Sequence, residues 1–384
     1  MAANLSFAQA PGPVRIGFVT DLSGQYQDLD GNGGAVAAQM AIDDFGGKVL
    51  GRAVELLVAD HQNKPDTAVA KAREWIDTRN VSMILGGTNS AAALAISALA
   101  KEKKRVFISI GAGTPALTNE QCSPNTIHYA YDTVALSRGT GRAMVESGGD
   151  TWFFLTADYL FGHALQADTT AVVNAGGGKV VGAAVHPVNA SDFASFMLRA
   201  QQSRAKVLAL ANGGADTINA LKSAREFGVT KTMRTASLIF FISDIHSLGL
   251  ETAQGLHYTT SWDWNLNDKT RQFGRRFFEK HKRMPTDLQA ADYSATMNFL
   301  KAVQAVGNTD ADAVMAYFKK TPLDDFYAKG VVRPDGRYEH DMYLMRVKTP
   351  SESKVPWDYS TLVKRMPGSE IFIKKSESKC ALWR

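Results

Sequence analysis

The chain has 384 residues, of which 45% are hydrophobic and 21% are charged. This length favours two or three domains, and this composition excludes wholesale disorder. The formal net charge of +5 arises within residues 345–384, where nine Lys or Arg stand against four Asp or Glu. A basic tail on a neutral body is weak evidence for nucleic-acid binding, so no nucleic-acid partner is expected. The longest apolar runs, such as residues 237–242, are too short to span a bilayer.

The N-terminus contains a short motif typical of an export signal. Ala8, Gln9 and Ala10 match the small-x-small pattern of a signal-peptidase site, directly before a Pro-Gly-Pro sequence. No basic region or full apolar stretch precedes them. We interpret residues 1–10 as the remnant of a trimmed export signal; the alternative is a chance match in an alanine-rich chain.

Strand-like and helix-like runs alternate from residue 14 onward. The pattern predicts strands over 14–20, 54–60, 81–85 and 105–110, with helices over 34–45, 65–79 and 90–103. It then restarts, with strands over 152–156, 179–185, 207–211 and 235–241 and helices over 162–175, 192–203 and 216–227. Ser191 is the expected N-cap of the helix over 192–203. Two such sets predict an α/β protein with two doubly wound parallel-sheet lobes.

The remaining sequence is less regular. It predicts a strand over 255–261, helices over 268–281, 288–306 and 311–319, and short strands over 330–333 and 342–347. A segment containing Pro, Ser and Lys follows.

Ligands of open parallel sheets bind outside the carboxyl ends of the strands, which directs attention to two loops. The loop over 86–92 joins a strand to a helix, and the first-turn N–H groups with the Thr88 and Ser90 hydroxyls are suited to an anion. The alternative is that Asn89 or Ser90 only caps the helix. The turn over 111–114 carries further exposed N–H groups and the Thr114 hydroxyl.

Aromatic residues gather near the same predicted loops. Each alone is more often a core residue, but several at strand ends suit a flat or apolar ligand. They are Tyr26, Tyr129, Tyr131, Tyr159, Phe161, Phe240, Phe241, Trp262 and Trp264.

Catalytic and cofactor motifs are missing from the sequence. It has no HExxH, GxSxG, full GxGxxG or P-loop pattern, and its two cysteines form no CxxC pair or Cys/His cluster. We therefore expect no enzymatic activity, no cofactor and no metal.

Five segments resemble, in order and spacing, the branched-chain (hydrophobic) amino-acid receptor family of periplasmic substrate-binding proteins of ABC importers. They are residues 14–24, 59–66, 86–92, 154–162 and 212–217, and the resemblance spans residues 14–345. It implies a type I periplasmic binding fold with three crossovers, delivery of a small molecule to a membrane permease, no catalysis, and a periplasmic monomer. The expected division is residues 1–13 as signal remnant and arm, 14–130 plus 262–325 as the first lobe, 131–261 plus 326–345 as the second, and 346–384 as a basic C-terminal tail.

The resemblance also implies which loops hold the ligand. In the family, the turns matching 88–90 and 111–114 grip a carboxylate, the position of Tyr159 covers the ligand, and an acid near 243–247 meets an α-ammonium. Here Asn89 lies in a usually Ser/Thr-rich turn and Phe240 and Phe241 precede Asp244, which favours the branch associated with aromatic and other hydrophobic carboxylates. The predicted ligand-binding residues are Tyr26, Asn89, Ser90, Gly111, Ala112, Thr114, Tyr131, Tyr159, Phe161, Asn212, Phe241, Asp244 and Trp262.

Export of the protein would favour a disulfide between its two cysteines. An oxidising compartment favours a pair, so Cys122 and Cys380 are predicted to form a disulfide that fastens the tail near the first crossover. Three alternatives to an aromatic-acid carrier remain: an amino-acid carrier with Asp244 as ammonium partner, a ligand-sensor module, and a Rossmann-like enzyme.

Overall fold

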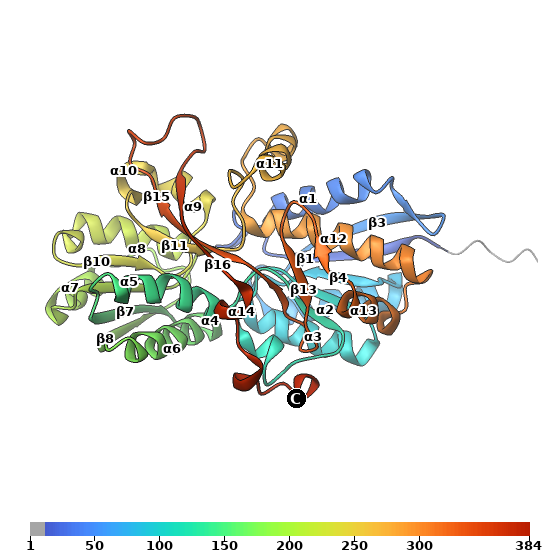
Figure 1. The fold of residues 1–384 in the computed structure, drawn as a ribbon, viewed down its shortest axis with the longest axis horizontal. Helices are drawn as coiled ribbons and strands as arrows, with labels where there is room; N and C mark the ends of the chain where they lie inside the picture. Colours follow the sequence, from blue (N-terminus) through green and yellow to red (C-terminus); the bar gives the residue numbers. More distant parts are fainter. Residues whose placement is uncertain (1–11) are drawn as a thin grey trace, which may run out of the picture.

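The computed structural model describes residues 12–384 as two lobes that lie side by side (Figure 1). The second lobe is green and yellow on the left, and the first is mainly blue, cyan and orange on the right. The interpretation of residues 1–10 as a signal remnant concerns residues outside the described range.

The first lobe is built on a six-stranded sheet of order β2-β3-β1-β4-β5-β6, parallel except for β2. Its strands are β1 (Val14–Thr20), β2 (Lys48–Val49), β3 (Arg52–Asp60), β4 (Met83–Gly86), β5 (Val106–Ser109) and β6 (Thr126–His128). Its helices are α1 (Gly31–Asp44), α2 (Pro65–Arg79), α3 (Ser90–Lys103), the short 3-10 helix η1 (Pro115–Thr118), α11 (Asp268–His281), α12 (Asp287–Val306) and α13 (Ala311–Lys320).

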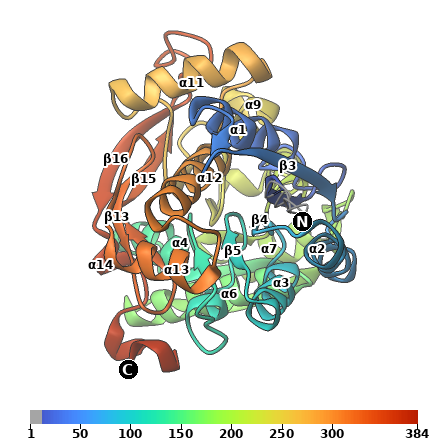
Figure 2. The same cartoon turned by 90° about the vertical axis from the view of Figure 1, so that its right-hand side faces the viewer.

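Alternate strand residues feed two separate cores in this lobe. Phe18 and Leu85 pack in a cluster with α1 and α12, whereas the neighbouring Val19 and Ile84 pack with α2 and α3. Successive side chains of a strand point to opposite faces, so apolar residues at every position require helices on both faces. Figure 2 shows α1 and α12 on one side of these strands and α2 and α3 on the other.

The second lobe has a four-stranded parallel sheet of order β10-β9-β7-β8. Its strands are β7 (Thr151–Ala157), β8 (Lys179–His186), β9 (Val207–Ala211) and β10 (Arg234–Ser237). Its helices are α4 (Thr133–Leu136), the π-helical turn η2 (Ser137–Gly141), α5 (Arg142–Glu146), α6 (Leu160–Ala175), α7 (Ala194–Ser203), α8 (Ala215–Glu226), η3 (Val229–Lys231), α9 (Ile242–Leu248) and α10 (Leu250–Ala253). The two parallel sheets confirm the predicted α/β fold.

Two local predictions in this lobe are wrong. The strand predicted over 235–241 ends at Ser237, and the chain beyond it leaves the sheet and turns into α9. The helix predicted from 192 begins at Ala194, with Phe193 rather than Ser191 at the N-cap. Asp192 accepts a hydrogen bond from the Ala194 N–H at 2.8 Å, which satisfies a first-turn donor in place of the expected serine.

Two small antiparallel sheets are formed by strands from the last part of the chain. One contains β11 (His257–Thr260), β15 (Met342–Val347) and β16 (Ser360–Met366), and the other β12 (Leu323–Asp324), β13 (Lys329–Val332) and β14 (Tyr338–His340). The region expected as a tail, residues 346–384, thus includes β16, which pairs along β15. Short helices α14 (Gly368–Ile371), η4 (Lys375–Glu377) and η5 (Ala381–Trp383) complete the chain.

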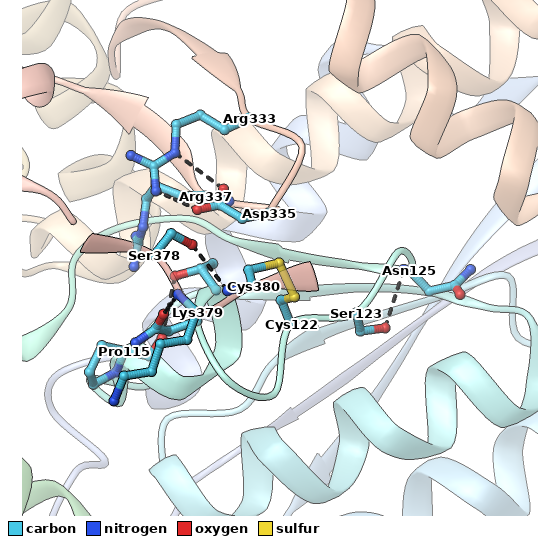
Figure 3. Close-up of a disulfide and its surroundings, with 12 residues drawn as sticks. Pro115, Cys122, Ser123, Asn125, Arg333, Asp335, Arg337, Ser378, Lys379 and Cys380 are labelled. Atoms are coloured by element: carbon cyan, nitrogen blue, oxygen red, sulfur yellow. Dashed lines mark hydrogen bonds and ion pairs between the residues drawn. A yellow bond between two sulfur atoms is a disulfide. The ribbon is translucent and has the colours of Figure 1, made fainter. Parts of the chain in front are cut away.

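The C-terminal segment, residues 368–384, is attached to both lobes. A disulfide joins Cys380 to Cys122, with the two Cα atoms 5.7 Å apart (Figure 3), and confirms the predicted pair. Arg138, on η2 of the second lobe, donates to the Phe372 carbonyl at 2.7 Å and to the Glu377 carboxylate at 2.8 Å. The C-terminal segment therefore links the first lobe, through Cys122, to the second lobe, through Arg138.

Candidate functional site

A small cavity of about 20 Å³ lies between the lobes. This is the scale of a single water molecule, so the lobes meet here in a closed arrangement. Its walls come from the loops after β1, β4, β5, β7, β9 and β10 and from the crossover after β6. The lining residues are Tyr26, Leu29, Thr88, Gly111, Tyr131, Tyr159, Phe161, Gly213, Ile239 and Phe241.

Close contacts between the lobes surround this cavity. The hydroxyls of Tyr26 and Tyr159 are hydrogen-bonded to each other. A Cβ on Gly113 would lie 2.5 Å from the Phe161 ring. Only a glycine at this position leaves room for the ring, so Gly113 permits the lobes to close.

The cavity wall is aromatic and uncharged. Among the described lining residues, none carries a charged side chain. Burial raises the pKa of the Tyr26, Tyr131 and Tyr159 hydroxyls, which keeps all three neutral. Tyr131 donates its proton to the Gly111 carbonyl at 3.1 Å. Such a wall suits a flat or apolar group.

The start of α3 adds hydrogen-bond donors beside this wall. Gly86 and Gly87 have φ of 109° and 74°, which favour glycine and turn the chain from β4 into the helix. Asn89 is the N-cap and accepts from the Ala92 N–H at 3.0 Å, and its amide donates to Asn63 at 2.7 Å. Ser90 is the first residue of α3, and its buried Oγ has no partner within residues 12–384. A free hydroxyl at a helix N-terminus is suited to an anion.

The turn over 111–114 is fixed by hydrogen bonds to its carbonyl and side-chain oxygens, whereas its backbone N–H groups form no hydrogen bonds among the described residues. The Ala112 carbonyl accepts from His128 Nε2 at 2.6 Å, and Thr114 caps η1 by accepting from the Ala116 N–H at 3.3 Å. Burial, and then the charge of Arg337, lower the pKa of His128, so this imidazole is neutral. None of the hydrogen bonds among residues 12–384 uses the N–H groups of 111–114.

Arg337 is itself buried beneath this turn. It is fully enclosed and forms an ion pair with Asp132 at 2.9 Å, and it also donates to His128 Nδ1 at 2.6 Å. The pair ties the β13–β14 region to the N-cap of α4. It therefore positions the crossover residues behind Tyr131, whose carbonyl accepts from Arg337 at 3.3 Å.

Seven predicted site residues do not line the cavity: four of them (Asn89, Ser90, Ala112 and Thr114) lie in the adjoining turns, and three lie elsewhere. The amide of Asn212 contacts His186 Nε2 at 3.0 Å and accepts from the Thr217 hydroxyl at 2.7 Å, which fixes the turn into α8. Trp262 packs on Phe273 and Phe326 and borders a separate cavity of about 10 Å³.

Asp244 is the third. It accepts from the Phe241 N–H at 3.1 Å at the start of α9. Its carboxyl is buried, and burial raises its pKa to about 7. The structure thus brings together Tyr26, Gly111, Tyr131, Tyr159, Phe161 and Phe241 around the cavity, with Asn89, Ser90, Ala112 and Thr114 in the adjoining turns.

Four lining residues were missing from the predicted set. Thr88 has the clearest signal, because its hydroxyl stands in the glycine-rich turn before α3. Gly213 lies two residues after the buried strand β9, in the Gly-Gly turn before α8. Leu29 and Ile239 lie in irregular loops and have no periodic pattern that would single them out.

Two lobes with parallel sheets, closed on a cavity at the carboxyl ends of their strands, define a type I two-lobed binding protein. The sequence matches the family described as "Periplasmic binding protein" over residues 13–354, and the chain belongs to this family. Among curated protein sequences, no match to this chain is found. Within residues 12–384, no helix has the length and apolar character needed to cross a membrane.

Solved structures similar to this chain agree with the family. A periplasmic binding protein from Burkholderia mallei is 59% identical, with 97% of this chain and 99% of that chain covered and a TM-score of 0.95. A branched chain amino acid ABC transporter periplasmic ligand-binding protein from Burkholderia xenovorans is 39% identical, with 97% and 100% covered and a TM-score of 0.87. A solute binding protein of an ABC transporter from Rhodopseudomonas palustris, in complex with 3,4-dihydroxybenzoic acid, is 21% identical, with 93% and 98% covered and a TM-score of 0.84.

Proposed function

We propose that this chain is the solute-binding protein of an ABC importer, which captures a small aromatic or otherwise hydrophobic carboxylate between its lobes and delivers it to a membrane permease. It acts as a periplasmic monomer, without catalysis or a cofactor. The proposed division into lobes is 14–130 plus 262–325 and 131–261 plus 326–345.

One observation carries this proposal: aromatic side chains from both lobes enclose a cavity beside unused hydrogen-bond donors. Tyr26 from the first lobe, Tyr131 at the crossover, and Tyr159, Phe161 and Phe241 from the second lobe suit a ring or an apolar body. The Ser90 hydroxyl and the N–H groups of 111–114 supply donors for a carboxylate. The dihydroxybenzoate complex of the Rhodopseudomonas protein, which has the same fold, supports this ligand class.

An amino-acid ligand is the second candidate, because the Burkholderia xenovorans relative is described as a branched chain amino acid protein. In that case Asp244 would meet the ammonium. Against it stand the position of Asp244, which caps α9 and is not part of the lining, and its raised pKa of about 7. A half-protonated carboxyl behind the wall is a poor partner for an ammonium group.

Ligand capture follows from an equilibrium between open and closed lobes. A ligand that contacts both lobes binds the closed form better and shifts the population toward it. The contact between Tyr26 and Tyr159 already joins the lobes, so the ligand has to replace or extend that contact. The closed form is the one that docks on the permease.

Isothermal titration calorimetry with benzoate, cinnamate, leucine and valine tests the ligand class. We expect the two aromatic acids to bind and the two amino acids to bind weakly or not at all. Ser90→Ala should weaken binding of the aromatic acid about 10- to 100-fold, because a hydrogen bond to a charged group is lost. Ser97→Ala is the matched control, since Ser97 lies on the same helix and bonds Thr126 at 2.7 Å. Tight binding of leucine or valine with no response to either aromatic acid would overturn the proposal.

A further inference from the structure

The C-terminal segment is anchored on the first lobe near the end of the chain. The disulfide joins Cys380 to Cys122, in the loop after η1 (Figure 3), and the Lys379 N–H donates to Asn119 Oδ1 at 2.6 Å. Glu377 lies three residues before Cys380, so its backbone stays within about 11 Å of the covalent anchor even if the intervening chain is fully extended. The first lobe therefore determines where Glu377 lies.

One side chain of the second lobe holds the same segment. Arg138 Nη1 donates to the Phe372 carbonyl at 2.7 Å, and Arg138 Nη2 donates to the two carboxylate oxygens of Glu377 at 2.8 and 2.9 Å. The Lys374 N–H also donates to the Glu377 carboxylate, at 2.8 Å. The Arg138 side chain is 17% exposed and that of Glu377 is 43% exposed. A charge-assisted contact thus joins a residue of the second lobe to a residue that is anchored on the first.

The backbone that carries Arg138 is packed tightly. Arg138 is on the π-helical turn η2, and a Cβ on the following Gly139 would collide with the Thr259 side chain of β11. The Thr140 and Thr259 hydroxyls are hydrogen-bonded at 2.9 Å. Because η2 also packs on α6, it moves together with the second lobe. A hydrogen bond fails beyond about 3.5 Å, so a relative shift of about 1 Å between Arg138 and Glu377 is enough to break their contact.

We propose that the C-terminal segment is a strap that favours the closed lobes, because its Arg138–Glu377 contact forms on closure and the Cys122–Cys380 disulfide keeps Glu377 on the first lobe. The inference rests on the closing motion in the proposed function and adds a device outside the ligand cavity. When the lobes rotate apart, Arg138 moves with the second lobe while Glu377 stays with the first, so the contact is lost. A ligand that binds the closed form then binds more tightly with the strap in place.

The disulfide is essential to this action. Without it, the end of the chain can follow Arg138 when the lobes open, and the contact with Glu377 no longer distinguishes the two forms. Exposed ion pairs contribute little to an equilibrium, whereas a partly buried arginine that also donates to a carbonyl lies at the upper end of their range. Loss of the contact should therefore reduce the ratio of closed to open molecules about three- to tenfold.

Small-angle X-ray scattering of the ligand-free chain, together with calorimetry with benzoate, tests the inference. Glu377→Gln keeps an acceptor for the Lys374 N–H and removes the charge that faces Arg138. If the ligand-free chain is mainly closed, this variant should raise its radius of gyration. If the chain is mainly open, the variant should weaken benzoate binding about three- to tenfold.

The matched control removes a similar ion pair from within one lobe. Arg73 donates to the two carboxylate oxygens of Glu102 at 2.9 and 3.0 Å, and both residues are on helices of the first lobe. Glu102→Gln should change neither the radius of gyration nor the dissociation constant. If Glu377→Gln also changes neither, or if Glu102→Gln changes them equally, the strap is refuted.

A further comparison tests the role of the disulfide. In the chain with Cys122→Ser and Cys380→Ser, Glu377→Gln should change either quantity much less than in the oxidised chain, because the two sites act as one unit. An equal effect with and without the disulfide would refute the strap. Glu377→Gln and Glu102→Gln retain the disulfide, so they decide the question even if the disulfide-free chain does not fold.

The strap and the proposed function can fail separately. If no aromatic acid binds, the proposed ligand class fails, and the scattering of the ligand-free variants still decides whether the strap holds the lobes. If benzoate binds to the parent and Glu377→Gln alters neither quantity, the strap fails and the proposed function stands.

Discussion

Removal of the Cys122–Cys380 disulfide is expected to cost a large part of the stability of this protein. The two cysteines are 258 residues apart, so the bond closes a loop that includes most of the chain. In the chain-entropy treatment, a loop of this length removes about 19 cal/mol/K from the unfolded state, or about 5.5 kcal/mol at 25 °C. Ordinary domains are stable by about 5–15 kcal/mol in total, so Cys122→Ala with Cys380→Ala should leave a marginal protein.

The assay is urea denaturation followed by circular dichroism, with the double variant compared against the oxidised parent. The midpoint should fall by roughly 2–3 M if the slope is about 2–3 kcal/mol/M. Cys380 is buried while Cys122 is partly so, and alanine at both positions removes little packing. The parent reduced by a thiol reagent is therefore the matched control and should show the same shift.

The result that would refute this reasoning is a loss of less than about 1 kcal/mol in both the variant and the reduced parent. Such a result would mean that non-covalent contacts keep the C-terminal segment close to the rest of the chain even in the unfolded state. The disulfide would then remove little additional entropy. The native contacts of that segment are the candidates: Arg138 with Glu377 and Phe372, the Lys379 N–H with Asn119 at 2.6 Å, and Arg333 over the Trp383 ring at 4.0 Å.

Three further predictions concern the lobes and their buried charges. Gly113→Ala would place a Cβ 2.5 Å from the Phe161 ring and should weaken ligand binding at least tenfold by calorimetry; an unchanged dissociation constant would mean that the lobes close without this contact. Burial raises the pKa of Asp244 from 3.8 to about 7. The contribution of this group to the free energy of unfolding is therefore fully present below about pH 4, and it is lost as the pH rises through 7. Asp244→Asn should therefore raise the free energy of unfolding at pH 8 by up to about 4 kcal/mol and change it little at pH 4, and equal effects at both pH values would contradict this. Arg337→Met leaves the buried Asp132 without its partner and should cost about 3–5 kcal/mol in denaturant titrations, with Asp132→Asn in the same chain recovering part of the loss; no recovery would show that the ion pair is not the source.

Most of the fold could be predicted from the sequence, because the apolar runs of its strands and the end signals of its helices agree with the observed packing. Buried parallel strands leave short apolar runs, and the helices between them have clear ends, so the parallel core of both sheets was predicted, although the short strands β2 and β6 were not. Two further elements show why a signal can be missing. The π-helical turn Ser137–Gly141 is rich in glycine and resembles a break. Strand β16, Ser360–Met366, has five consecutive exposed residues, so its sequence shows no alternation of apolar and polar residues.

The site was harder to predict, because ligand contacts and helix caps use the same residue types. Asn89, Thr114 and Asp244 each stand where a polar side chain meets free N–H groups, and the structure shows each as a cap. Only the three-dimensional surroundings separate a cap from a ligand contact. Ser90 differs from them, since its hydroxyl is buried without a partner within the described residues.

The charges near the cavity lie one layer behind its wall, and this arrangement explains how a neutral wall can still select a ligand. One carboxyl oxygen of Asp30 accepts from the hydroxyls of Thr20 and Thr88, and Arg337 is paired with Asp132. Each buried charge fixes the direction of a neutral group in front of it. Arg337 sets the tautomer of His128, which holds the turn over 111–114, and Asp30 accepts from the hydroxyl of Thr88 at 2.9 Å. The backbone N–H groups of 111–114 are thereby held in place for a ligand, without the desolvation cost of a charged side chain in the wall.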